Sequence, residues 1–175
     1  MTRALPLAGA ALAGALVLAL CLALIGGGGA GPAKAAAKTW KAPDGSFSIV
    51  TPRGWKAVAS GSAATVLQRG DKRGVVVIRE RAAVTGPLDA LAGQLERRLR
   101  RQVADFRPAG ARVATVGGGQ GLVYTFVRTE ANQVQSVVVA PAGSRSYTLD
   151  LVADGDAPDV ARELAGMVRS FSPRR

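Results

Sequence analysis

The chain has 175 residues, of which 48% are hydrophobic, so its length and composition allow one domain with a single core. It contains no histidine, and its one cysteine, Cys21, lies in an apolar N-terminal stretch. This composition excludes Ser-His-Asp and Cys-His catalytic machinery and zinc sites made of thiolate or imidazole. The formal net charge of +11 favours anionic partners, although an arginine-rich composition is also expected from GC-rich coding.

The N-terminal stretch is predicted to be a targeting or anchoring segment. Residues 4–33 carry no charge, and no soluble domain of this size is expected to begin in this way. Residues 1–35 are therefore expected to be a signal peptide or an N-terminal membrane anchor. Ala33 and Ala35 fit a cleavage site that leaves a mature N-terminus near Ala36. The apolar run, at about 20 residues, is also long enough to cross a bilayer as a helix.

Two further features bear on the location of the domain. Only Arg3 precedes the apolar run, whereas three lysines follow it between residues 34 and 41. Because positive charge normally stays on the cytoplasmic side, an uncleaved helix would favour a cytoplasm-facing single-pass protein. Cys21 follows Leu20, where a lipobox has Gly, Ala or Ser, so a lipoprotein is not favoured. We expect an extracytoplasmic domain, secreted or membrane-anchored, in preference to a cytoplasm-facing one.

The folded part is predicted to begin with a hairpin. Residues 36–43 are expected to form a linker and the first strand, and Asp44-Gly45 is a tight-turn signal ahead of a second strand at 46–50. In that strand Phe and Ile alternate with serines, as a half-buried strand requires. A Pro-Arg-Gly corner then returns Trp55 to the core.

Two strands are predicted next, at 64–68 and 75–81, and a helix follows them. Thr85 is expected to cap this helix, with Pro87 in its first turn. The apolar row expected on one face comprises Leu88, Leu91, Leu95, Leu99 and Val103. The opposite, exposed face is expected to carry the candidate residues for binding an anionic surface, which are Arg97, Arg98, Arg100 and Arg101.

The second half of the chain predicts an antiparallel meander and a last helix. The four strands are expected at 112–116, 122–127, 134–140 and 147–152. The helix is expected to begin near Asp156, and its apolar row comprises Val160, Leu164, Met167, Val168 and Phe171. Two main helices with a mostly antiparallel sheet indicate an α+β domain over residues 44–172.

Four segments resemble the PsbP-like superfamily in their order along the chain: "FSIVTPRGW", "GLVYTFVR", "SYTLDLVA" and "LAGMVRSF". The superfamily includes the photosystem II protein PsbP, a Ran-binding nuclear import factor and bacterial envelope proteins of the LpqN type. The resemblance covers about residues 41–172. It implies an α/β/α sandwich with a central, mostly antiparallel sheet, export in bacteria, and binding or assembly roles without catalysis. It transfers no catalytic residue.

The alternative is an enzyme that uses carboxylates. The acidic residues gather in one region and comprise Asp150, Asp154, Asp156, Asp159 and Glu163. If the first three converged in a pocket, they could serve a metal-assisted hydrolase. Helix capping and a solvated edge explain the same residues without a ligand, and glycine is missing where a calcium loop would bend. We therefore expect no metal and no cofactor.

The sequence thus predicts a non-catalytic, exported binding or assembly module of the cell envelope. The expected partner is an envelope protein or an anionic membrane surface, and the N-terminal segment would hold the domain at the membrane if it stays uncleaved. Nucleic acid is not expected as a partner, because the chain has no recognised binding motif and its leader indicates the envelope.

Overall fold

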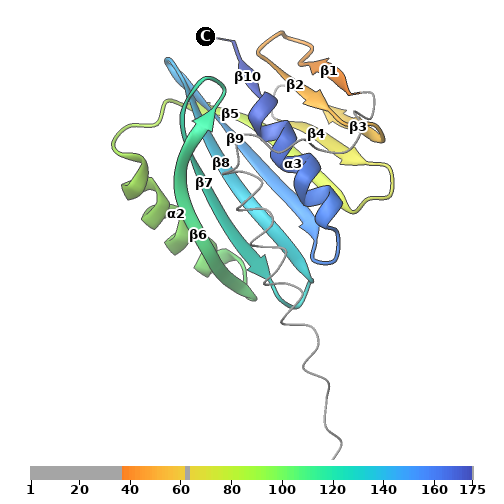
Figure 1. Ribbon diagram of the computed structural model, residues 1–175. Coiled ribbons are helices and arrows are strands. Elements are labelled where there is room, and N and C mark those ends of the chain that lie inside the picture. The colour runs from red at the N-terminus through yellow and green to blue at the C-terminus, as the bar shows by residue number, and fades with distance from the viewer. Residues whose placement is uncertain (1–36, 62–63, 175) are drawn as a thin grey trace, which may run out of the picture.

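The computed structural model describes residues 37–61 and 64–174 (Figure 1). These residues form a seven-stranded sheet in the order β3-β4-β5-β9-β8-β7-β6 and a three-stranded sheet in the order β1-β2-β10. All neighbouring strands are antiparallel. The elements are β1 (Lys38–Lys41), β2 (Phe47–Thr51), β3 (Trp55–Ser60), β4 (Thr65–Arg69), β5 (Gly74–Ala82), α2 (Leu88–Gln102), β6 (Phe106–Val116), β7 (Gly119–Arg128), β8 (Gln133–Ala142), β9 (Arg145–Asp154), α3 (Pro158–Ser170) and β10 (Ser172–Pro173). The predicted α+β class is confirmed.

The small sheet is built on the predicted hairpin. β1 and β2 pair through the turn at Asp44-Gly45, where Gly45 has a φ of 69° and Asp44 accepts a hydrogen bond of 2.9 Å from the Ser46 amide. A left-handed φ of this kind favours glycine. The last strand, β10, pairs with the other edge of β2, where Ser172 lies opposite Ser48. The hairpin prediction is confirmed, whereas β10 and β3 were not predicted.

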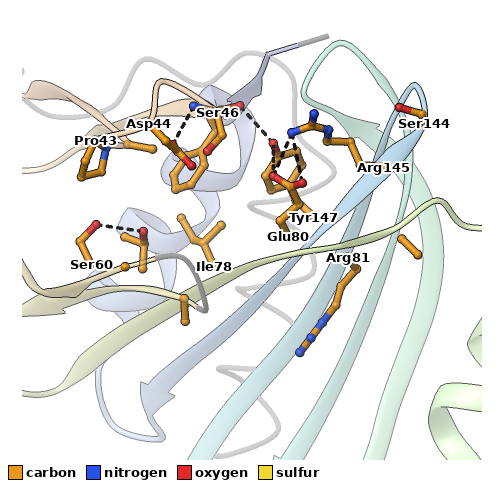
Figure 2. A pocket seen from close by; sticks show the side chains of 16 residues that line it. Pro43, Asp44, Ser46, Ser60, Ile78, Glu80, Arg81, Ser144, Arg145 and Tyr147 are labelled. Carbon is orange, nitrogen blue, oxygen red and sulfur yellow. Dashed lines mark hydrogen bonds and ion pairs between the residues drawn. The ribbon is translucent and has the colours of Figure 1, made fainter.

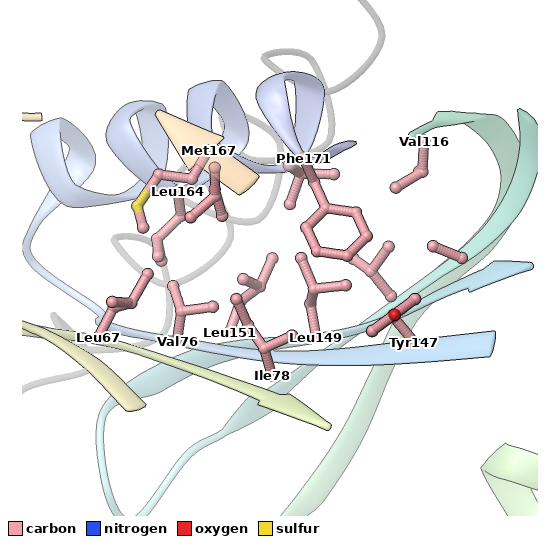
Figure 3. Packing of buried hydrophobic residues seen from close by; sticks show 14 of the residues in the cluster. Leu67, Val76, Ile78, Val116, Tyr147, Leu149, Leu151, Leu164, Met167 and Phe171 are labelled. Atoms are coloured by element: carbon pink, nitrogen blue, oxygen red, sulfur yellow. The ribbon is translucent and has the colours of Figure 1, made fainter. Parts of the chain in front are cut away.

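Helix α3 packs on one face of the large sheet (Figure 3). Its predicted apolar row is buried and packs with Leu67, Val76, Ile78, Leu149 and Leu151 from β4, β5 and β9. Phe47 of the small sheet joins this core through Phe171, at a ring distance of 5.4 Å. The predicted burial of Trp55 is confirmed, since the residue is 8% exposed and its indole N–H donates to Glu163 over 2.7 Å.

Helix α2 lies on the opposite face (Figure 1) and forms a second core. Leu95 and Leu99 are buried there against aromatic and valine side chains of β6, β7 and β8. The predicted cap at Thr85 is wrong. Pro87 is the residue that precedes the first turn, and no side chain caps it. Gly86, with a φ of 95°, redirects the chain between Thr85 and the helix, so the Thr85 hydroxyl lies outside the helix start.

Helix α2 covers only part of its sheet face. On β8, Val137 and Val139 are buried beneath the helix. Their neighbours across the β8–β9 ladder, Asp150 and Thr148, are only half-buried. Helix α2 therefore covers β8 but not the neighbouring strand β9. The site described below lies at this boundary.

The predicted signal peptide or anchor at residues 1–35 lies outside the described residues. Within 37–61 and 64–174, no helix is both long and apolar enough to cross a membrane.

Candidate functional site

The four candidate arginines of α2 differ in their surroundings. All four are exposed. Arg100 donates two hydrogen bonds to Glu96, of 3.0 and 2.7 Å, and its guanidinium lies 5.3 Å from the centre of the Phe106 ring. The hydrogen bonds from Arg100 lower the pKa of Glu96. Arg98 and Arg101, in contrast, lie on the side of α2 that borders the sheet boundary. The predicted exposure of all four arginines is confirmed, and their binding of an anionic surface stays a prediction.

A cleft of about 490 Å³ lies between α2 and the sheet, where the cover by the helix ends. Its apolar wall comes from α2, from the end of β5 and the segment after it, and from β8. The residues of this wall are Ala82, Val84, Leu91, Leu95, Val137 and Val139. Its polar wall consists of Arg81, Gln94, Arg98, Arg101, Ser146, Thr148 and Asp150. We call this site the α2 cleft.

The rim of the α2 cleft is cationic. Arg81 comes from β5, and Arg98 and Arg101 are three residues apart on α2, so they lie on neighbouring turns of the helix. The side chains of these three form no hydrogen bond or ion pair with another residue in the described part of the chain. The only carboxylate in the lining is Asp150, and Arg79 already pairs with it. The rim therefore carries three guanidiniums that have no ion-pair partner among the described residues.

The pKa of Asp150 reflects the excess of positive charge at the rim of the cleft. Burial raises the pKa of Asp150, and the positive charges of Arg79, Arg98 and Arg81 act in the opposite direction. A half-buried carboxylate surrounded by three arginines cannot neutralise all of them. An added anion would meet an unbalanced positive field in a site that is partly shielded from water.

A larger pocket, of about 910 Å³, lies on the other side of β5, near the small sheet (Figure 2). There Glu80 pairs with Arg145 at 3.1 Å, and the Tyr147 hydroxyl lies 3.2 Å from the Glu80 carboxylate. Burial raises the pKa of Tyr147, and the charge of Glu80 adds to this effect. Arg81 lines both this pocket and the α2 cleft, and Figure 2 shows it extending away from Glu80, Arg145 and Tyr147. Glu80 and Arg145 neutralise each other. The lining of this pocket therefore carries less unpaired positive charge than the lining of the α2 cleft.

The acidic residues do not converge as the hydrolase alternative requires. Asp154 and Asp156 pair with Arg73, at 3.6 and 2.6 Å, whereas Asp150 pairs with Arg79. Farther along, Asp159 and Glu163 contact Arg69, at 2.8 and 3.4 Å. Among the residues that the structure describes, no group of three His, Cys, Asp or Glu side chains is placed to hold a metal ion. The proposed carboxylate site is therefore not assembled.

Sequence reasoning missed Arg81 as a site residue. The signal was present, because Arg79 and Arg81 alternate with the buried Val76 and Ile78 and must face the other side of the sheet. What the strand pattern cannot indicate is that this side borders α2, because that depends on the strand order, in which β9 separates β5 from β8.

Comparisons with known proteins agree with this architecture. The sequence matches no family model and no curated protein. The structure is similar to that of the cyanobacterial PsbP from Synechocystis sp. PCC 6803, with a TM-score of 0.60 and 15% identity over 85% of this chain and 98% of that one. It is also similar to the Ran-binding protein Mog1p of Saccharomyces cerevisiae, with a TM-score of 0.57 and 11% identity over 78% of this chain and 95% of that one.

A third similar structure is LpqN of Mycobacterium tuberculosis, which is described as involved in cell envelope biogenesis. The TM-score is 0.51, with 14% identity over 79% of this chain and 91% of that one. At these identities the likeness concerns the fold. The predicted PsbP-like fold is therefore confirmed.

Proposed function

We propose that this protein is an exported, non-catalytic binding module of the cell envelope that contacts anionic partners through the α2 cleft. The similar structures support a binding role, since one is a Ran-binding protein and another is involved in cell envelope biogenesis. The apolar N-terminal segment supports export. The absence of histidine from the sequence supports a role without acid–base catalysis of the usual kind.

One observation carries the proposal: Arg81, Arg98 and Arg101 line the α2 cleft, and within residues 37–61 and 64–174 none of their side chains forms an ion pair with a carboxylate. Guanidiniums bind carboxylates and phosphates through paired hydrogen bonds, and such contacts are stronger than those between neutral groups. Each basic residue near an anionic bilayer contributes about 1 kcal/mol, so three give a few kcal/mol. This attraction is weak for a free domain, but an uncleaved N-terminal anchor would raise its effective concentration at the membrane.

Vesicle sedimentation tests the proposal with the predicted mature form, which begins at Ala36. Both cores consist of residues between Ala42 and Phe171, so this form retains the whole described fold. We expect it to sediment with vesicles that contain phosphatidylglycerol and to be released by salt, because exposed charges are screened. Replacing Arg81, Arg98 and Arg101 by Gln should abolish this binding. Equal sedimentation with neutral and anionic vesicles would contradict the proposal.

A further inference from the structure

The α2 cleft joins its charged rim to an apolar floor. Leu91 and Val84 line the cleft and also pack, half-buried, against the core beneath α2. Val137 and Val139 belong both to that core and to the cleft. The cleft is therefore an opening into the second core. An apolar chain that entered it would extend the core and lose contact with water, which is favourable in proportion to the area buried.

The arginine side chains of the rim lie on two sides of this opening. Arg81 reaches it from the sheet, while Arg98 and Arg101 reach it from the helix. An acidic group between them could accept hydrogen bonds from more than one guanidinium. The volume of about 490 Å³ lies within the range of roughly 300 to 1,000 Å³ that is usual for small-molecule sites.

These two features together identify a class of ligand. The headgroups of a flat bilayer would meet the arginines but would leave the apolar floor empty. A small inorganic anion would do the same, and a neutral lipid would leave the arginines without a partner. A molecule with one acidic head and one apolar chain matches both parts of the cleft.

We propose that the α2 cleft binds a single-chain anionic amphiphile, one molecule at a time. Its acidic head lies between Arg81, Arg98 and Arg101, and its chain lies on the leucine and valine floor. The inference rests on the proposed function, because both assign anion binding to the same arginines. It goes further in naming a monomeric ligand that leaves the membrane or micelle to occupy the site.

Calorimetric titration of the mature form with decanoate tests the inference, with decanoate kept below the concentration at which it forms micelles. We expect saturable binding with one site, and no comparable binding of acetate, which lacks the chain, or of 1-decanol, which lacks the charge. Binding of 1-decanol or acetate with the same affinity would overturn the proposal.

Charge variants locate the head group. Arg98→Gln with Arg101→Gln should weaken decanoate binding about tenfold or more, because a charge-assisted hydrogen bond contributes about that factor. The matched control, Arg53→Gln with Arg162→Gln, removes the same charge from exposed positions outside the cleft and should change the affinity less than about twofold. Equal weakening in both variants would show general attraction and would overturn the assignment.

A cleft-filling variant separates the chain from the charge. Thr148 is half-buried on β9 and lines the cleft. Thr148→Phe should therefore block decanoate while leaving all three arginines in place, and sedimentation with anionic vesicles should persist. Unfolding by denaturant checks that the variant is folded. Retained decanoate binding by the folded variant would overturn the inference, whereas vesicle binding without decanoate binding in the unmodified protein would overturn it and leave the proposed function standing.

Discussion

The two faces of the seven-stranded sheet are made by the same strands, yet the helices cover them differently. Beneath α3 the strands are fully buried, and the pocket on that face lies beyond the helix, beside the small sheet. On the other face the cover ends at the edge of α2 itself. On the α3 face, Leu149, Leu151 and Leu164 are at most 1% exposed, and the small sheet packs beside the helix. On the α2 face, the helix covers β6 to β8 and leaves β9 and β5 half-exposed. The difference leads us to expect that the α3 face contributes more to stability, and it is the reason for proposing a binding site on the α2 face.

The largest expected effect concerns the two tryptophans. Trp55 is part of the sealed core, whereas Trp40 of β1 is only partly buried beside Phe47, at a ring distance of 5.6 Å. We expect Trp55→Ala to lower the free energy of unfolding by about 3 to 5 kcal/mol and Trp40→Ala by roughly half of that or less. Urea denaturation measures both. A near-unchanged midpoint for Trp55→Ala would mean that the α3 face does not dominate stability.

An intermediate effect is expected from one substitution made on each face. A methyl group on Gly74 would lie 2.6 Å from Val160 and 2.8 Å from Trp55, whereas on Gly93 of α2 the nearest atom is an Arg97 nitrogen at 3.5 Å. Gly74→Ala should therefore destabilise the protein by about 1 to 3 kcal/mol through overpacking. Gly93→Ala should stabilise it by about 0.5 to 1 kcal/mol through helix propensity.

Thermal unfolding of the two glycine variants is the check. Opposite signs are expected, because a methyl group has no room at Gly74 and has room at Gly93. If both variants were destabilised to the same extent, the contrast in packing between the faces would be wrong.

The smallest expected effect is a change in how the stability of the protein depends on acidic pH, and it comes from a residue on the α2 side. Asp105 follows α2, and its side chain is 2% exposed beside Arg128 at 2.8 Å. The hydrogen bond from Arg128 lowers the pKa of Asp105, and the Ala131 amide adds to this effect. A lowered pKa stabilises the fold above the ordinary aspartate value of about 4, and this contribution is lost as the pH falls through the folded value.

Asp105→Asn should therefore destabilise the protein at pH 7, and the difference from the unmodified protein should shrink as the pH falls below about 4. Denaturation midpoints measured across the acid range follow this difference. A difference that stays constant down to the most acidic conditions would show that the charge of Asp105 is not what connects α2 to the turn between β7 and β8.

The sequence predicted the parts of the fold that follow from periodic apolar residues. The α3 row and the strands of the meander were identified because burial repeats at the helix or strand period. Strand β3 was missed because its five residues after Trp55 are exposed, so no apolar alternation marks them. Strand β10 was missed because its pairing with β2 joins residues more than a hundred positions apart.

The candidate site was predicted only in part, for a related reason. The apolar row of α2 correctly indicated which side of the helix is buried, and so which arginines are exposed. It could not indicate that Arg98 and Arg101 border a cleft while Arg100 pairs with Glu96, because that depends on where the sheet ends beneath the helix. Anionic binding by these arginines remains a prediction.

The most direct test of the difference between the two faces is a methyl NMR titration of the mature form with decanoate. The account predicts that resonances of Leu91, Val137 and Val139 shift as the ligand is added, because these side chains line the α2 cleft. The resonances of Leu149 and Leu164, which lie in the sealed core, should stay in place. Shifts confined to the α3 face or to the larger pocket beside the small sheet, with the α2 cleft unchanged, would contradict the account.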